Sequence, residues 1–398
     1  MSATTMRILR RLGITALFCL VAFATARDAQ AYPQFQFSSG TNRCSQCHQS
    51  PSGGGLLTSW GRDESGDTIS LGGDGAFLHG LVSTPSWLAL GGDLRFAVIN
   101  NDVGSPAGPE VEAFPMQADL YARVALGDAW SINVIGGARG VVRPDDDSPL
   151  GRLGTTADRL ISREHYLMWR PSATGPYARI GRFFAPYGLR FAEHIYYVRR
   201  YTGFNLYEET YNVSGGFVEE DWEAHATAFA PVPTGLPDFL RSVGPREYGL
   251  TGYGELRLAK MSAIAGQFRL GFADDESRLQ GGVIGKLWLD KAKLLFLGEA
   301  DLIHQSLKGS GYAQNQLVSF TGVNLFPTRG LMLGVAYERF QEDLSYSYTG
   351  RNAYDFQLNF FPWAHCEAVL LGRYQLTGGG PVDGGTARLV MLQLHYYL

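Results

Sequence analysis

Apolar and polar side chains alternate along most of the chain from about Leu88 to its end. Apolar residues take nearly every second position at 88–98, and the same period of two recurs at 118–126 and from Ile132 onward. Because successive side chains of a β-strand point to opposite faces of a sheet, this period predicts strands. Further strands are predicted at 247–258, 261–272, 278–289, 293–305, 315–326, 331–340, 354–361 and 367–376.

Short and long connections alternate between the predicted strands. The links at Ala259-Lys260 and Asp290-Lys291 are tight, whereas the stretches 144–158, 230–245 and 341–352 are long. Short periplasmic turns and longer outer loops give this alternation in transmembrane β-barrels of the bacterial outer membrane.

The last residues of the chain form the clearest of these strands. One face carries apolar or aromatic residues, and the other carries more polar ones: Val390, Leu392, Leu394, Tyr396 and Leu398 against Met391, Gln393, His395 and Tyr397. A soluble sandwich or propeller is the alternative, but a propeller would show a blade repeat of about 40–50 residues, which we do not find. We therefore predict an all-β fold, a transmembrane antiparallel β-barrel over residues 86–398. At roughly 20 residues per strand and connection, it would hold about 16 strands, with 14 as the alternative.

The first 31 residues have the layout of a secretory signal. Arg7, Arg10 and Arg11 precede an apolar stretch at 12–23, and Ala29-Gln30-Ala31 resembles a cleavage site. This signal and the barrel together predict export to the bacterial outer membrane, with outer-membrane lipid as a partner.

A five-residue motif lies between the signal and the barrel, in a glycine-interrupted segment at 32–85. Cys44-Ser45-Gln46-Cys47-His48 is the C-x-x-C-H attachment signature of c-type haem. Each thiol can bond one vinyl group, and His48 can then reach the iron as proximal ligand. A disulfide, or half of a zinc site, is the alternative. We predict one covalently attached haem c held by Cys44, Cys47 and His48, with His79 as a candidate distal ligand.

Composition narrows the class further. The net charge of −4 gives no reason to expect nucleic acid as a partner. Mean hydropathy is −0.09, and the mature chain has no apolar run long enough for a membrane helix.

Acidic triplets at 145–147, 219–221 and 274–276 could form a negative vestibule, although solvated loops explain them equally well. Arginines cluster between Arg179 and Arg200, and we expect Arg179 and Arg182, three positions apart, not to face the lumen together.

Residues on both sides of the haem motif resemble the fused cytochrome–porin family of outer-membrane iron oxidases. Pro33-Gln34-Phe35 followed by Gly40 resembles the P-x-F stretch that leads to a glycine in that family. Residues 57–62, Leu-Thr-Ser-Trp-Gly-Arg, resemble its L-T-P-F-G-R element, although a triple glycine precedes them here. The gap to the first cysteine is also one residue longer. Separately, residues 181–189 resemble a strand-and-turn element of phosphate-selective-type porins.

Two functional hypotheses follow. The resemblance implies an electron-transfer protein and iron oxidase that carries electrons from an extracellular small reductant such as Fe(II) to a periplasmic cytochrome. The alternative is a diffusion porin with a haem-bearing periplasmic cap used for sensing or structure. An open lumen would favour the porin, and a closed lumen would favour electron transfer.

Overall fold

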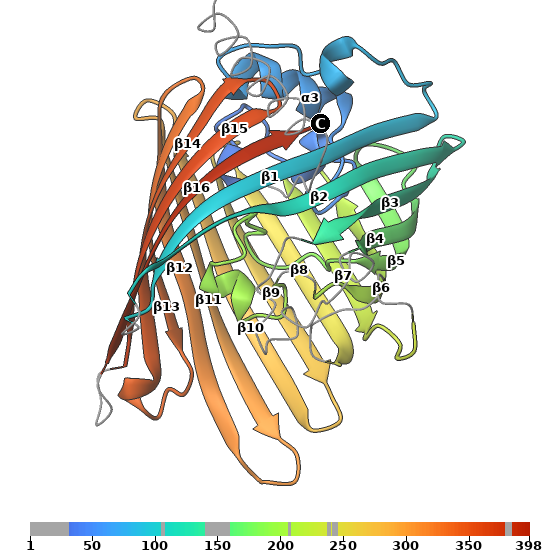
Figure 1. The fold of residues 1–398 in the computed structure, drawn as a ribbon. Helices are drawn as coiled ribbons and strands as arrows, with labels where there is room; N and C mark the ends of the chain where they lie inside the picture. The colour runs from blue at the N-terminus through green and yellow to red at the C-terminus, as the bar shows by residue number, and fades with distance from the viewer. Residues whose placement is uncertain are drawn as a thin grey trace, which may run out of the picture.

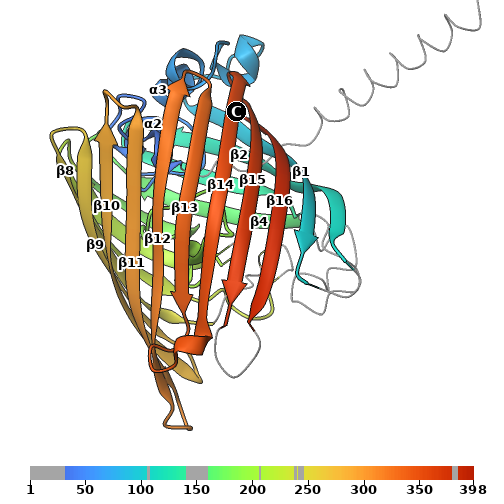
Figure 2. The same ribbon diagram turned by 90° about the vertical axis from the view of Figure 1, so that its left-hand side faces the viewer.

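The computed structural model describes residues 32–104, 108–139, 160–205, 208–236, 240, 246–378 and 384–398. Sixteen antiparallel strands form one closed barrel, in which each strand pairs with its neighbours in sequence and the last pairs with the first (Figures 1 and 2). The predicted fold class and strand number are confirmed. Within these residues no helix is both long and apolar enough to cross a membrane. The predicted signal at 1–31 lies outside the described residues.

The strands agree closely with the alternation in the sequence, and the helices are short. The helical elements are η1 Pro33–Phe35, α2 Cys44–Cys47, α3 Ser59–Glu64, η2 Ser65–Ile69, η3 Phe77–Gly80, α4 Tyr197–Arg200 and η6 Ser347–Thr349. The strands are β1 Leu88–Asp102, β2 Glu110–Leu126, β3 Trp130–Arg139, β4 Leu160–Trp169, β5 Gly175–Phe183, β6 Thr210–Val218, β7 Trp222–Ala230, β8 Tyr248–Leu258, β9 Ser262–Phe272, β10 Glu276–Leu289, β11 Leu294–Leu307, β12 Ala313–Thr328, β13 Leu331–Gln341, β14 Gly350–Trp363, β15 Cys366–Thr377 and β16 Gly385–Tyr397.

The outer face of the barrel is apolar and much of the inner face is polar. In β16, Leu392 and Leu394 are exposed on the outside, whereas Gln393 and His395 are buried inside. In β7, Glu223 and the residues two and four positions further along the strand are buried in the same way. This arrangement suits a bilayer in two ways. Apolar side chains face the lipid while polar ones face the lumen, and every strand forms backbone hydrogen bonds with its neighbours.

The two ends of the barrel differ. The connections after the even-numbered strands are short, for example 259–261, 329–330 and 364–365, and the C-terminus lies at the same end. The described connections at the opposite end are mostly longer, although 273–275 is also tight. The predicted long loop at 144–158 lies outside the part of the chain that the structure describes. Short turns face the periplasm in barrels of this kind, which orients the molecule.

A segment between β5 and β6 folds inward. The described part of this inward loop, residues 184–205 and 208–209, carries α4 and packs against the inner wall of the barrel (Figure 1). Its residues Phe191 and Tyr196 contact Phe320 of β12, with ring centroids 4.5 and 5.1 Å away. Apolar positions on the inner wall are thus covered by protein, and the lumen is partly filled.

One expectation about the arginines was wrong. Arg179 and Arg182 are both buried inside the barrel. Gly181, between them, has a φ of 143°, and a Cβ there would lie 2.2 Å from the carbonyl oxygen of His165. The strand therefore departs from regular alternation at Gly181, which brings the second arginine inside next to Glu209, 3.7 Å away.

The register of β16 predicts opposite responses at neighbouring positions. Leu394 is 55% exposed on the lipid face, so Leu394→Arg should lower the free energy of unfolding by about 2–4 kcal/mol if it lies near mid-membrane. Gln393 is 5% exposed and lines an internal cavity of about 700 Å³, so Gln393→Arg should cost far less. Urea unfolding in liposomes and heat-modifiable gel migration measure the difference. Equal costs would contradict the assigned faces.

Candidate functional site

The residues that precede β1 form a separate body in the short-turn mouth of the barrel (Figure 2). We call residues 32–87 the plug. Its first part enters the lumen, where Phe37 belongs to the same buried apolar cluster as the inward loop. The short helices α2 and α3 follow it. The plug therefore brings the C-x-x-C-H motif to the inner wall of the barrel.

A single helical turn presents the two cysteines. Cys44 and Cys47 begin and end α2, and residues three apart on a helix lie on the same side. The backbone then becomes extended at His48, whose N–H donates to the carbonyl of Cys44 over 3.0 Å. His48 also forms an isolated antiparallel bridge with Leu57. The two thiols and the imidazole are therefore fixed by local backbone contacts.

The element that follows the motif holds this turn in place. Thr58 caps α3, accepting a hydrogen bond from the backbone N–H of Gly61. The hydroxyl of Thr58 in turn donates to the carbonyl of Gln46 over 2.6 Å. A Cβ at Gly61 would lie 2.2 Å from the carbonyl oxygen of Cys47, so only glycine permits this approach of α3 to α2. The Leu-Thr-Ser-Trp-Gly-Arg stretch thus has a clear structural role beside the motif.

Cys44, Cys47 and His48 line one pocket of about 770 Å³ between the plug and the barrel wall. Aromatic and aliphatic side chains contribute much of the lining: Tyr32, Phe35, Leu57 and Ile69 from the plug, and Phe361 and Tyr397 from the wall. The composition suits a large flat apolar group with a few polar attachments.

Burial sets the chemistry of the three motif residues. Burial lowers the pKa of His48 to about 4, an effect that nearby backbone carbonyls of Gly55 and Gly54 oppose in part, so the imidazole is neutral at pH 7. Its Nδ1 is buried, and no described residue lies in hydrogen-bonding geometry to it. Burial also raises the pKa of Cys44, and raises that of Cys47 to about 12, so both thiols are protonated in the unmodified chain. A neutral imidazole is the form that ligates a metal.

Arg43 supplies a positive charge at the pocket. One of its terminal nitrogens, Nη2, lies 3.2 Å from Glu220 at the β6–β7 turn. Its Nε and Nη1 are buried and have no hydrogen-bond partner among the residues described. A buried guanidinium with free donors is costly unless an anion satisfies it, and haem carries two propionates. The residues present therefore fit haem at both its apolar and its acidic side.

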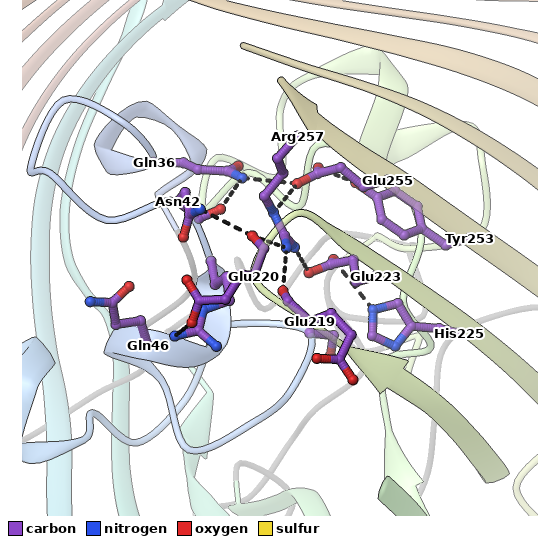
Figure 3. Close-up of polar contacts among 12 residues, drawn as sticks. Gln36, Asn42, Gln46, Glu219, Glu220, Glu223, His225, Tyr253, Glu255 and Arg257 are labelled. Carbon is purple, nitrogen blue, oxygen red and sulfur yellow. Dashed lines mark hydrogen bonds and ion pairs between the residues drawn. The ribbon is translucent and has the colours of Figure 1, made fainter. Parts of the chain in front are cut away.

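Polar contacts anchor the plug to the inner wall (Figure 3). Gln36 donates to the carboxylate of Glu255 over 2.9 Å and accepts from Lys286 over 2.7 Å. Asn42 donates to the carbonyl of Glu220 over 3.1 Å. The side chains of Gln36, Glu255 and Lys286 are all buried. Hydrogen bonds to charged groups are strong in such surroundings.

Backbone pairing fixes the other side of the plug to the short turns. The N–H of Leu71 donates to Phe361 over 3.0 Å, and that of Gly330 donates to Ile69 over 2.9 Å. The N–H of Ala364 donates to Gly72 over 2.7 Å. The plug is therefore tied to the barrel around much of its edge.

His79 does not share the pocket with the motif. It lies in η3, where its Nε2 is 3.2 Å from the hydroxyl of Tyr396 and its ring packs 5.0 Å from that of His365. His395 does line the pocket, but it lies 2.6 Å from Glu367 and 3.1 Å from Asp93. The alternation of β16 pointed His395 inward, but no sequence signal linked it to the motif. The distal role of His79 stays a prediction that this geometry does not favour.

The acidic triplets do not form one vestibule in the described part of the chain. Residues 219–221 lie at the short-turn end beside the plug, whereas 274–276 lie at the opposite end. The triplet at 145–147 lies outside the described residues. Among those that are described, no group of three or more His, Cys, Asp or Glu is placed to hold a metal ion.

Comparison with solved structures establishes the fold. The anion-selective porin from Comamonas acidovorans superposes with a TM-score of 0.58 at 11% identity, covering 78% of this chain and 99% of that one. This chain has a porin fold. Outer-membrane expressed OmpT of Vibrio cholerae gives 0.57 at 10% identity over 80% of this chain and 100% of that one. The outer membrane channel DcaP of Acinetobacter baumannii gives 0.54 at 12% identity over 78% and 97%. No protein-family description and no curated protein matches the sequence.

The close packing at Gly61 gives a test of the site. Gly61→Ala should force α3 away from α2, at a cost of about 1–3 kcal/mol, and open the plug to limited proteolysis near the motif. Gly72→Ala is the matched control, because its Cβ would meet only the ring of Trp363 at 3.9 Å. Mass spectrometry of the proteolytic fragments from folded barrels measures the protection of both variants. Equal protection of the two variants would contradict the packing described here.

Proposed function

We propose that this protein carries electrons across the outer membrane as a fusion of a c-type cytochrome segment with a porin barrel. The observation that carries the proposal is the pocket in which Cys44, Cys47 and His48 meet the aromatic residues of the barrel wall. The porin fold and the predicted export signal support an outer-membrane location. The iron substrate, and with it the iron-oxidase activity, rests on the family resemblance alone.

Haem c, once attached, would supply a one-electron carrier. The thiols of Cys44 and Cys47 would bind it covalently, and His48 would ligate its iron. The free donors of Arg43 would hold its carboxylates. Phe35, the wall side chains and the surrounding plug would exclude water from the haem. Burial and low polarity are among the features by which a protein sets the reduction potential of a haem.

The position of the plug supports a direction of access. The plug lies at the short-turn end, which faces the periplasm in this fold. A soluble periplasmic cytochrome could therefore reach the plug from its own compartment. A small extracellular reductant such as Fe(II) would reach it through the lumen, past the inward loop. One membrane-embedded chain would then join two compartments without releasing the donor into the periplasm.

The second candidate is a diffusion porin with a haem-bearing periplasmic cap. The similarity in fold to solved porins and channels favours it. The many contacts that seat the plug and the inward loop in the lumen favour the electron-transfer function, because a filled barrel conducts solutes poorly. Conductance in planar bilayers separates the two: large steady channels would support the porin, and near-silent membranes would support the conduit.

Covalent attachment is the first prediction. The mature protein should keep haem peroxidase staining on denaturing gels, and Cys44→Ser combined with Cys47→Ser should abolish it. Cys366→Ser is the matched control, because Cys366 lies in β15 outside the pocket and its loss should leave the stain unchanged. Staining that survives the double substitution would overturn the haem assignment.

Electron transfer is the second prediction. Proteoliposomes that enclose an oxidised soluble cytochrome should reduce it when a membrane-impermeant reductant is added outside. His48→Ala should slow this reduction at least about tenfold, because the iron loses its axial ligand. Reduction at the same rate with His48→Ala would show that haem is not the carrier. Free passage of small sugars without reduction would favour the porin.

A further inference from the structure

A second and larger cavity lies in the middle of the barrel. It measures about 840 Å³, and both the plug and the inward loop line it. The plug contributes Ser50, Ser52 and the triple glycine that follows them, and the wall contributes β3, β4, β5 and β11. We call it the central cavity. None of the cysteines or histidines discussed above lines it, so it is distinct from the motif pocket.

Arg179 is the most unusual residue of the central cavity. It is only 3% exposed. Its two terminal nitrogens donate to the hydroxyls of Ser50 and Ser52, over 3.2 and 2.9 Å, and its guanidinium lies 3.9 Å from the ring centroid of Phe183. Its Nε is buried with no partner among the described residues, and no described carboxylate lies within ion-pair distance. A buried cation whose direct contacts are all with neutral groups favours an anionic partner.

The other arginines that line the cavity have partners within the protein. Arg163 and Arg190 also line the cavity but are paired, with Glu209 over 3.0 Å and Glu223 over 3.1 Å. Arg199 donates to backbone carbonyls, including that of Phe204 over 2.9 Å. The lining thus contains four arginines.

Neither of the two acidic groups of the lining forms a direct ion pair with Arg179. Glu299 accepts from the N–H of Leu189 over 2.7 Å and from Gln267 over 2.9 Å. Glu164 is near enough to interact electrostatically with Arg179 but forms no direct ion pair with it. Arg179 therefore has no direct carboxylate partner among the described residues.

We propose that the central cavity binds a small organic anion with two or more carboxylates, and that Arg179 is its main recognition residue. A guanidinium presents donors in a planar fork that matches a carboxylate, and low polarity around it strengthens such a pair. A free divalent cation would be repelled by Arg179, which has no direct carboxylate partner among the described residues. The proposal concerns binding only, and it stands whether or not haem occupies the neighbouring pocket.

Calorimetric titration of the full chain in detergent with citrate tests the proposal. At constant ionic strength, citrate should bind saturably, and trehalose, an uncharged molecule of similar size, should not. Arg179→Gln should raise the Kd by about tenfold or more, because it removes a charge-assisted bidentate contact. Arg179→Lys should give an intermediate Kd, since it keeps the charge but loses the fork. Ser52→Ala should weaken binding less than Arg179→Gln, because the charge remains.

Arg278→Gln is the matched control. Arg278 is an arginine of β10 that does not line the cavity and pairs with Glu276 over 2.8 Å. It should leave the Kd unchanged. Heat-modifiable migration confirms that each variant has folded. Absence of saturable citrate binding, an unchanged Kd in both Arg179 variants, or an equal loss in Arg278→Gln would overturn the proposal.

The same samples separate this proposal from the proposed function. Haem staining should be unaffected by Arg179→Gln, because Arg179 does not line the motif pocket. Citrate binding in a chain that lacks the stain would support the anion site while contradicting the haem assignment. A stained chain that binds no citrate would support haem attachment while overturning the anion site.

Discussion

Barrel closure is the constraint on which the rest of the structure depends. In a bilayer, each unpaired backbone group would cost several kcal/mol, so the edges of the sheet must meet. β16 pairs with β1 from Asp93 opposite Tyr397 to Asp102 opposite Arg388. The C-terminal Leu398 continues the pairing, and its N–H donates to the carbonyl of Gly92 over 2.7 Å. The strand that follows the plug is therefore the one on which the whole barrel closes.

Closure also creates the polar interior that the plug requires. Strand alternation turns apolar side chains toward lipid, and the same alternation directs Glu223, Glu255 and Lys286 inward. Buried charges are destabilising unless they are paired, and here they pair with each other and with residues of the plug. The plug therefore completes the hydrogen bonding of the wall as well as occupying its lumen. A contact such as that between Gln36 and Glu255 stabilises both partners at once.

The sequence was sufficient for the fold because the period of two persists through each strand. It assigned Leu394 to lipid and Gln393 to the interior, as found. It failed where the backbone is irregular: at Gly181 the strand departs from alternation and both Arg179 and Arg182 are buried, whereas a sequence does not show the φ angle of a glycine. The motif identified three pocket residues, but Phe361 and His395 reach the pocket only when the barrel closes. They lie more than 300 positions from the motif, and no local sequence pattern predicts contacts over that separation.

The motif pocket has two halves that come from opposite ends of the chain. Cys44, Cys47 and His48 belong to its first part, whereas Phe361, His395 and Tyr397 belong to its last three strands. During export the first half emerges long before the second. A chain that has not yet closed its barrel therefore has the three motif residues without the wall that shields them. The complete pocket is a property of the assembled, membrane-inserted molecule, which makes completion of the site a late step in biogenesis.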